Sequence, residues 1–476
     1  MNILARAITV LLCITTLCTP ATRAQSRIQS PPMGWNSWDA YGLTITEAQF
    51  RANVSVLKQK LLPFGWRYAV IDEGWFFENP QDRPHPEKLV YAIDSHGRYV
   101  PVPARFPSAA APPDTQPLTG TSVPSVPPTS FILETSFAPL GRWVHAQGLL
   151  FGIHIVRGIP RVSVERNLPI DAPGNFHAQD AANQTDACPW DPTNWGIKNN
   201  AAGQAWYDSL LRQYAAWGVD LLKVDCISDH PYKEDEIRMI RRAIDKTGRP
   251  MVLSLSPGPT STDHAQAVSE LATMWRVSED VWDVWDSKPG VTFPQSVKNQ
   301  FERAMAWDHF GFGHGHWPDM DMLPLGELNP SPGWGGPRRT RLTPDEQRTL
   351  ITLWATSRSP LILGANLTLL DDFTLQLLTN RKLLEIDQTA TDSAEILRKG
   401  DLVVRRASLP AKGQRRIAIA AFNLGDQPMA DDDALTALLP FIKANDKLSL
   451  IDIWTGQRLG KLSQIPPHGC VLLIAK

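Results

Sequence analysis

The pattern of apolar and polar positions predicts buried strands that alternate with amphipathic helices. The apolar runs are Met33–Trp38, Tyr68–Ile71, Leu149–Ile155, Val219–Val224, Met251–Leu255, Met274–Val277, Phe310–His314 and Pro360–Leu363. Because they show no polar alternation, they are typical of strands in a parallel sheet covered on both faces. Helical spacing occurs at Thr46–Leu62, Phe137–Ala146, Ala201–Trp217, Lys233–Lys246, Phe293–Trp307 and Pro344–Ser357. About eight strand–helix units without a Gly-rich dinucleotide turn favour an α/β fold of the (β/α)8 TIM-barrel type.

The pattern changes toward the C-terminal end. From about residue 394 the helical spacing gives way to short strands at Leu402–Arg406, Arg416–Phe422, Leu448–Trp454 and Cys470–Ile474. We therefore predict a catalytic barrel over residues 25–390 and a C-terminal antiparallel β-sandwich over residues 394–476. Segment 109–130 contains six prolines and no aromatic residue, so we interpret it as a Pro-rich surface insert in the barrel.

The N-terminal residues have the pattern of a targeting segment. Arg6 precedes an apolar run, and the small residues Thr22 and Ala24 stand before Gln25. This arrangement predicts a signal peptide over residues 1–24 and a secreted or periplasmic protein, with an uncleaved anchor as the alternative. The run is too short to span a bilayer, and no later segment offers 18 consecutive apolar residues, so we expect no membrane partner.

Removal of the signal peptide leaves Cys188, Cys226 and Cys470. Three thiols are too few for a disulfide scaffold, but an oxidising compartment permits one bond. We predict that Cys188 pairs with Cys226 and that Cys470 is free.

Composition and charge exclude some functions. The chain is 43% hydrophobic and carries 47 basic against 49 acidic side chains, which is ordinary for a globular protein. Its net charge of -2 provides no basic surface for phosphates, so nucleic acid is not an expected partner. Seventeen tryptophans against seven tyrosines would suit stacking on sugar rings, although a large core explains them equally well.

Acidic residues recur where the predicted strands end. They are Asp72, Glu73, Asp225, Asp280, Asp319 and Asp321. One such acid usually caps the next helix, but the carboxyl ends of barrel strands meet on one face. Several carboxylates that converge there cost stability, which points to catalysis, metal binding or a hydroxyl-rich ligand.

Five motifs occur in an order that resembles a known family. They are Pro32-Met33-Gly34-Trp35-Asn36-Ser37-Trp38, Tyr68 to Phe76, Leu221-Leu222-Lys223-Val224-Asp225, Trp275-Arg276 through Asp280, and Trp317-Pro318-Asp319-Met320-Asp321-Met322-Leu323. This pattern resembles the family 27 glycoside hydrolases of clan D, the retaining α-galactosidases (melibiases) and α-N-acetylgalactosaminidases. The resemblance runs from about Pro31 to Gln388 and also implies a C-terminal β-sandwich.

The resemblance implies roles for two acids. Asp225 would be the nucleophile and Asp280 the general acid/base, about 5 to 5.5 Å apart as retention requires. Lys223 lies on the same strand face as Asp225 and would keep it ionised, although an ion pair in the barrel core is the structural alternative. Asp280 is expected to be the less solvated carboxyl, walled by Trp275, Trp282 or Trp285, with a helix N-cap as the alternative.

The same resemblance implies sugar contacts. Asp72 would accept hydrogen bonds from the hydroxyls on C4 and C6, and Asp321 would contact the 2-position. Arg276 would bind nearby and orient carboxylates. Trp38 and Trp75 would present flat faces to the sugar ring, although a core position is nearly as plausible for each.

Three departures from the family pattern leave the sugar open. Glu73 replaces a second Asp and would crowd the contact at C6. His154 replaces a Tyr, as a ligand contact or a structural histidine. Ser256 stands where galactosidases often carry a larger acid, which leaves room for an N-acetyl group. We expect hydrolysis of terminal α-D-galactosides in an oligosaccharide or polysaccharide, with α-N-acetylgalactosaminides or β-L-arabinopyranosides as alternatives.

Two other classes compete with this prediction. A metal-dependent hydrolase could use the acids together with His154, His314 and His316. A carbohydrate-binding protein without turnover would need no nucleophile, so the presence of both Asp225 and Asp280 speaks against it. We expect no metal and no cofactor, and the sequence leaves the oligomeric state open.

Overall fold

The computed structural model describes residues 28–85, 88–110, 130–288, 290–291, 293–310, 315–410, 416–430, 451–456 and 464–475. The predicted signal peptide over residues 1–24 lies outside the described residues, as do residues 111–129 of the predicted Pro-rich insert.

Eight parallel strands form the barrel. They are β1 (Met33–Asn36), β2 (Tyr68–Ile71), β5 (Leu150–Val156), β9 (Leu221–Asp225), β10 (Val252–Leu255), β11 (Met274–Arg276), β12 (Trp317–Asp319) and β15 (Leu361–Leu363), in the order β12-β11-β10-β9-β5-β2-β1-β15. The two edges meet where Leu323, just after β12, bridges Leu363 in parallel and donates its N–H to the Ile362 carbonyl at 2.8 Å. The predicted (β/α)8 barrel is therefore confirmed.

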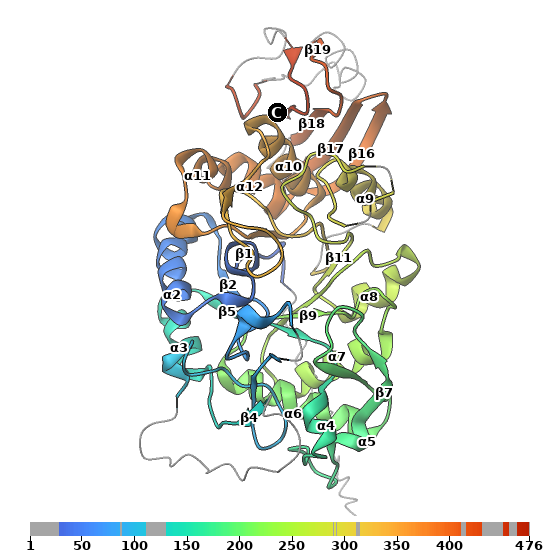
Figure 1. Cartoon of the computed structure of the whole chain (residues 1–476). Coiled ribbons are helices and arrows are strands. Elements are labelled where there is room, and N and C mark those ends of the chain that lie inside the picture. Colours follow the sequence, from blue (N-terminus) through green and yellow to red (C-terminus); the bar gives the residue numbers. More distant parts are fainter. Residues whose placement is uncertain are drawn as a thin grey trace, which may run out of the picture.

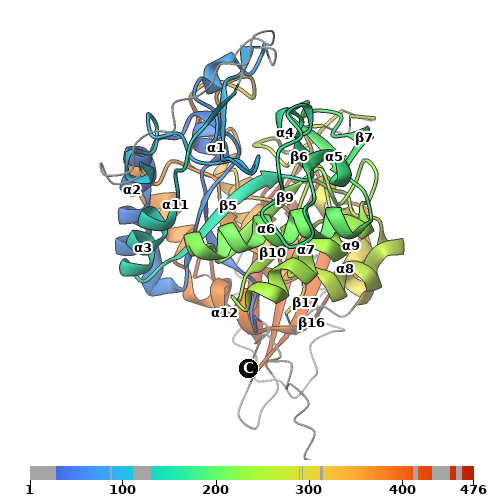
Figure 2. The same ribbon diagram turned by 90° about the horizontal axis from the view of Figure 1, so that it is seen from below.

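Helices surround the strands. They are α1 (Trp38–Tyr41), α2 (Glu47–Val56), α3 (Ala138–Ala146), α4 (Arg161–Glu165), α5 (Ala178–Ala181), α6 (Ala201–Trp217), α7 (Glu234–Thr247), α8 (Ala265–Leu271), α9 (Asn299–Trp307), α10 (Pro344–Ser357), α11 (Asp372–Leu378) and α12 (Arg381–Thr389). Seen from below, α2 and α3 lie on one side of the barrel and α8 on the other, with α6 and α7 between them (Figure 2). Thr46 and Thr343 begin α2 and α10 with capping boxes, so local sequence fixes these starts. None of the helices in the described ranges has the length and hydropathy to cross a membrane.

Short strands form three small sheets in the segments that connect the barrel strands and helices. β3 (Tyr91–Ile93) pairs with β4 (Ser130–Ile132), β8 (Asn194–Ile197) lies between β6 (Ile159–Pro160) and β7 (Ala182–Ala187), and β13 (Glu327–Leu328) pairs with β14 (Arg338–Arg339). The predicted Cys188–Cys226 disulfide is confirmed, and Cys470 is a free, half-buried thiol. The disulfide ties the segment after β7 to the residue that follows β9.

The predicted strand at Phe310–His314 is wrong at its start. Phe310 ends the 3-10 helix η8 (Asp308–Phe310), and residues 311–314 lie outside the described residues. Phe310 is 46% exposed, and its ring packs 5.4 Å from that of Trp307 at the end of α9. The seventh barrel strand is β12, where Trp317 is fully buried. Helix α9 also begins at Asn299, later than the predicted Phe293.

The C-terminal region is an antiparallel β-sandwich, as predicted. Its main sheet orders β16 (Thr391–Lys399), β17 (Leu402–Leu409), β18 (Arg416–Asn423) and β21 (Cys470–Ala475), and β19 (Met429–Ala430) pairs with β20 (Gln464–Ile465). One face joins the barrel core through side chains such as Val403 and Phe422, whereas Val404 and Ile419 form a separate core on the other face. The sheet lies beside α10 and α12 (Figure 1). Of the predicted strand Leu448–Trp454, residues 448–450 lie outside the described residues, and Asp452 bridges Leu473.

Candidate active site

The residues predicted from the sequence lie at the carboxyl ends of the barrel strands. Trp38 follows β1, Asp72 and Glu73 follow β2, His154 lies in β5, Lys223 and Asp225 end β9, Ser256 follows β10, Arg276 ends β11, Asp280 follows it, and Asp321 follows β12. Because all eight strands are parallel, these ends share one face of the barrel.

Lys223 and Asp72 form a buried ion pair across the barrel. The Lys223 ammonium is 2.8 Å from Asp72 Oδ2, and the Asn36 amide donates to the same oxygen at 2.6 Å. Burial alone would raise the pKa of Asp72, but Lys223 and then His154 lower it below its ordinary value. Burial opposes the charge of Lys223, yet Asp72 and Asp225 raise its pKa. Both groups are therefore charged at neutral pH, and Lys223 lines a small cavity together with Ser256, Arg276 and Asp321.

Asp225 is held by neighbours that favour its ionised form. Its Oδ1 accepts from the Cys226 N–H at 2.7 Å and from the Ser256 hydroxyl at 3.3 Å. His154 Nε2 lies 3.7 Å from Asp225 Oδ2. Burial would raise the pKa of Asp225, but His154 and Lys223 lower it. An ionised, partly accessible carboxylate is what a nucleophile in glycoside hydrolysis needs.

Arg276 joins the two acids of the opposite wall. Its guanidinium is 3.2 Å from Asp280 Oδ1 and 2.8 Å from Asp321 Oδ1. The backbone N–H of Val281 donates to Asp321 Oδ2 at 2.7 Å, which fixes the loop that carries Asp280. Burial raises the pKa of Asp321 to about 7, and Asp280 and Asp319 add to the rise against the opposing effect of Arg276.

The expectation that Asp280 is the less solvated carboxyl is wrong. Its side chain is 36% exposed, whereas that of Asp225 is 19% exposed. The three tryptophans expected to wall it each have another ring or guanidinium neighbour: Trp307 for Trp275, Arg338 for Trp282 and His468 for Trp285. Asp280 stands on the loop that follows β11.

Glu73 occupies a confined position beside Asp72. The residue is 8% exposed, and its Oε1 has no hydrogen-bond partner among the described residues. Burial and the nearby Asp191 raise the pKa of Glu73 well above its ordinary value. The side chain, one methylene longer than an aspartate, is thus packed into the site, and these surroundings favour its neutral form.

The two tryptophans of the predicted sugar platform differ. Trp75 is fully buried, its indole N–H donates to the His154 carbonyl at 2.8 Å, and its ring packs edge-on against Trp217. The platform prediction is therefore wrong for Trp75, which is a core residue. Trp38 is 9% exposed, and its ring centroid lies 4.8 Å from that of the half-buried Trp334.

Two residues of the site had no role in the sequence prediction. Asn36 fixes Asp72, and its place at the end of β1 was a usable signal. Asp39 is fully buried behind the site, and its Oδ2 has no hydrogen-bond partner in the described ranges. Burial, and then Asp321, raise the pKa of Asp39 well above its ordinary value. Nothing in the sequence distinguishes Asp39 from an acid that begins a surface helix.

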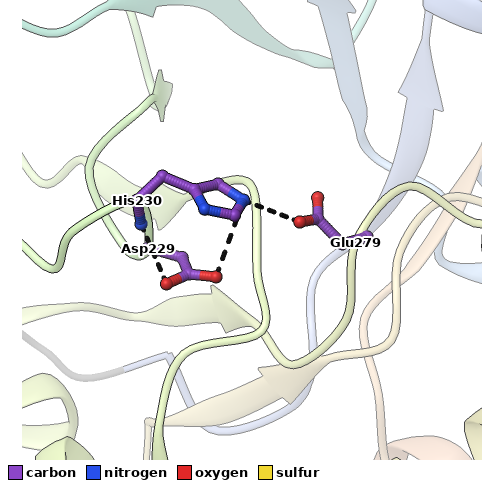
Figure 3. Close-up of side chains that lie close together, drawn as sticks. All are labelled: Asp229, His230 and Glu279. Carbon is purple, nitrogen blue, oxygen red and sulfur yellow. Dashed lines mark hydrogen bonds and ion pairs between the residues drawn. The ribbon is translucent and has the colours of Figure 1, made fainter. Parts of the chain in front are cut away.

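Two histidines of the metal-dependent alternative, His154 and His316, lie apart. His154 lies near the carboxyl end of β5, whereas His316 precedes β12 and so lies at the opposite end of the barrel. His314 lies outside the described residues. In the part of the chain that the structure describes, Asp229, His230 and Glu279 form a group that could hold a metal ion, with ligand atoms within 4.8 Å of one another (Figure 3).

Comparisons with known proteins agree with this geometry. A family model described as alpha galactosidase A matches residues 198–389. A curated α-galactosidase of Cyamopsis tetragonoloba is 25% identical over 76% of this chain, and the match spans 64% of that protein.

Solved structures extend the comparison to the whole chain. A candidate α-N-acetylgalactosaminidase of Bacillus halodurans is 33% identical over 95% of this chain and 98% of its own, with a TM-score of 0.74. A GH27 β-L-arabinopyranosidase of Geobacillus stearothermophilus is 36% identical over 94% of this chain and 96% of its own, with a TM-score of 0.77. The chain therefore belongs to family 27 of the glycoside hydrolases and is a glycoside hydrolase related to the α-galactosidases.

Proposed function

We propose that the protein hydrolyses terminal glycosides with net retention of anomeric configuration. Asp225 attacks the anomeric carbon while Asp280 gives a proton to the departing oxygen. A water molecule then attacks the anomeric carbon while Asp280 takes its proton; the bond between that carbon and Asp225 breaks, which releases the sugar and restores the carboxylate of Asp225 and the protonated Asp280. The ionised state favoured at Asp225 and the exposure of Asp280 toward solvent support this division of roles.

Two sugars fit the same set of contacts. An α-D-galactopyranoside and a β-L-arabinopyranoside have the same ring configuration, and the pentose lacks only the C6 hydroxymethyl group. The charged pair of Asp72 and Lys223 offers an acceptor and a donor to ring hydroxyls in either case. The distinction between them depends on the space beside Asp72.

The buried position of the Glu73 side chain is the observation that favours the pentose. Its carboxyl group is buried and close enough to Asp72 to be affected by its charge. If Asp72 accepts hydrogen bonds from the sugar as the family resemblance implies, the hydroxymethyl group of a galactoside would compete with Glu73 for this space. A galactoside would have to displace the Glu73 side chain, whereas an arabinopyranoside leaves it in place. The likeness to the Geobacillus arabinopyranosidase supports the same conclusion. We therefore propose β-L-arabinopyranosides as the preferred substrates and α-D-galactosides as the second candidate.

A substrate series tests this specificity. The kcat/KM for the nitrophenyl β-L-arabinopyranoside should exceed that for the α-galactoside and the α-N-acetylgalactosaminide. Glu73→Asp removes one methylene and should move the ratio toward the galactoside by about tenfold or more. Glu73→Gln keeps the length and serves as the control, so its ratio should stay on the arabinoside side. A galactoside preference in the unaltered protein would overturn the pentose assignment.

Covalent trapping tests the mechanism separately. A 2-deoxy-2-fluoro glycoside of the preferred sugar should leave one glycosyl group on Asp225, located by peptide mass spectrometry. Labelling of another residue would contradict the proposed nucleophile. We further propose export through residues 1–24, which the disulfide supports, and amino-terminal sequencing of the exported protein should begin at Gln25.

A further inference from the structure

Asp229, His230 and Glu279 form a polar cluster near the proposed catalytic residues Asp225 and Asp280, and the proposed mechanism gives this cluster no role. Asp229 and His230 follow the strand that carries Asp225, and Glu279 directly precedes Asp280. His230 Nε2 lies 2.7 Å from Glu279 Oε1 and 3.7 Å from Asp229 Oδ2 (Figure 3). The side chains of His230 and Asp229 are 39% and 30% exposed, so the cluster is open to solvent.

An exposed tryptophan completes the cluster. Trp190 is 36% exposed, and its ring centroid lies 5.3 Å from that of His230 at an interplanar angle of 85°. Its carbonyl accepts a hydrogen bond from Arg83 at 2.7 Å. Trp190 also follows Cys188 closely, and the disulfide joins Cys188 to the residue after Asp225. The backbone that carries Trp190 is therefore tied to Arg83 and, through Cys188, to the residue that follows Asp225.

The position of the cluster relates it to the leaving group. The general acid must reach the oxygen of the bond that breaks, so the leaving group lies beside Asp280. Glu279 is the neighbour of Asp280 and is 17% exposed. Asp280 acts electrostatically on the Glu279 carboxyl group, which contacts His230, and His230 in turn contacts Trp190. We therefore expect a leaving group beside Asp280 to come within reach of this cluster.

The composition of the cluster fits a sugar. An indole offers an apolar face to the C–H side of a pyranose, and carboxylates accept hydrogen bonds from hydroxyls. Burial raises the pKa of Glu279, and His230 opposes that rise through its hydrogen bond. Asp229 adds a second carboxyl group to the cluster. A neutral, hydroxyl-rich ring matches these surroundings better than an anion does.

We propose that Trp190, His230 and Glu279 form a binding subsite for a second pyranose on the leaving-group side of the scissile bond. This inference rests on the proposed function, and it adds that the substrate is a disaccharide or longer glycoside rather than a simple alkyl glycoside. The subsite holds the leaving sugar and takes no part in bond breaking.

Metal binding is the competing explanation for the three polar side chains. Asp229, His230 and Glu279 have the right ligand types for a divalent transition metal. A metal ion would leave the exposed indole of Trp190 without a purpose, whereas a sugar would use it. Trp190 is therefore the residue on which the test depends.

The test compares a leaving group that fills the subsite with one that does not. The glycosyl fluoride of the preferred sugar has a single-atom leaving group, and a disaccharide with the same terminal sugar places a pyranose in the subsite. For Trp190→Ala, the ratio of kcat/KM for the disaccharide to that for the fluoride should fall about tenfold, the size of a lost ring contact. Phe310→Ala is the matched control, because this exposed aromatic residue lies between α9 and β12 at the far end of the barrel, and its ratio should not change.

A second readout uses acceptor sugars. The glycosyl enzyme formed from the fluoride should transfer to an added pyranose less often in Trp190→Ala than in the unaltered protein, whereas transfer to methanol should be equal. An unchanged disaccharide ratio, or a ratio that shifts only when zinc or EDTA is added, would overturn the sugar subsite. Failure of the unaltered protein to cleave any glycosyl fluoride would instead refute the proposed function.

Discussion

Asp39→Asn should remove a cost of folding that grows with pH. Asp39 is fully buried, and its Oδ2 has no hydrogen-bond partner within the described segments. A Cβ on Gly364 would lie 1.9 Å from that oxygen, so the carboxyl group is wedged against the backbone after β15. Burial, Asp321 and Asp280 raise its pKa well above the ordinary value, while Lys223 opposes the rise.

The sign of the effect follows from proton linkage. In the unfolded chain an aspartate loses its proton above about pH 3.9. The folded protein keeps that proton up to the raised pKa of Asp39, so folding takes up a proton between the two values. The free energy of unfolding therefore falls as pH rises through this window, by about 1.4 kcal/mol per pH unit for one group. An asparagine does not titrate, so the variant lacks this term.

Urea denaturation at pH 5, 6, 7 and 8 measures the difference. The stability of Asp39→Asn relative to the unaltered protein should increase by about 1.4 kcal/mol for each pH unit until the pKa of Asp39 is reached. The absolute offset depends on how the new amide packs, so the slope is the decisive quantity. Asp235→Asn, on the exposed start of α7, should give no such slope. A relative stability that is constant over this range would refute the assignment of a retained proton to Asp39.

Three other perturbations follow from the same geometry. Asp225→Ala should lower kcat by about 10⁴-fold or more while circular dichroism stays unchanged, and wild-type turnover would contradict its role. The Cys188–Cys226 bond closes a loop across a separation of 38 residues and so restricts the unfolded chain. Its removal should lower the free energy of unfolding in urea by about 3–4 kcal/mol, whereas Cys470→Ser should lower it far less. Gly364→Ala should cost about 2 kcal/mol or more through its clash with Asp39; Gly336→Ala, in open space, is the control, and equal denaturation midpoints would refute the clash.

Strand positions were predictable because both faces of the barrel strands are covered. Tyr68–Ile71 is β2 at the same residues, and the predicted runs near β9, β10 and β15 differ from the structure by a residue or two. Their carboxyl ends also located the acids, since a parallel barrel brings those ends to one face. The same logic failed at Phe310, because an apolar residue beside glycines can end a helix as well as begin a strand.

Side-chain environments were less predictable than positions. Trp75 lies two residues after Glu73, yet its side chain is fully buried in the core, because residues 73–76 form a turn in which Gly74 has a φ of 95°. The exposure of Asp280 depends on where the loop after β11 goes, which no local pattern encodes. The burial and raised pKa of Asp39 could not be predicted locally, because Asp321 and Gly364, which lie close to it, come from distant segments of the chain.

The charge balance of the site explains how Asp72 and Asp225 are kept ionised among several acids. The acids that interact there include Asp39, Glu73, Asp72, Asp225, Asp280, Asp319 and Asp321. The cations that act on them include Lys223 and Arg276, and Arg83 at Glu73. Lys223 lies between Asp72 and Asp225, so its charge lowers the pKa of both. Arg276 is shared by Asp280 and Asp321, and burial raises the pKa of Asp321 in spite of this contact. Asp225 and Asp72 are thus held ionised, whereas burial favours the neutral forms of Asp39, Glu73, Asp319 and Asp321. A neutral carboxyl group can donate a hydrogen bond as well as accept one.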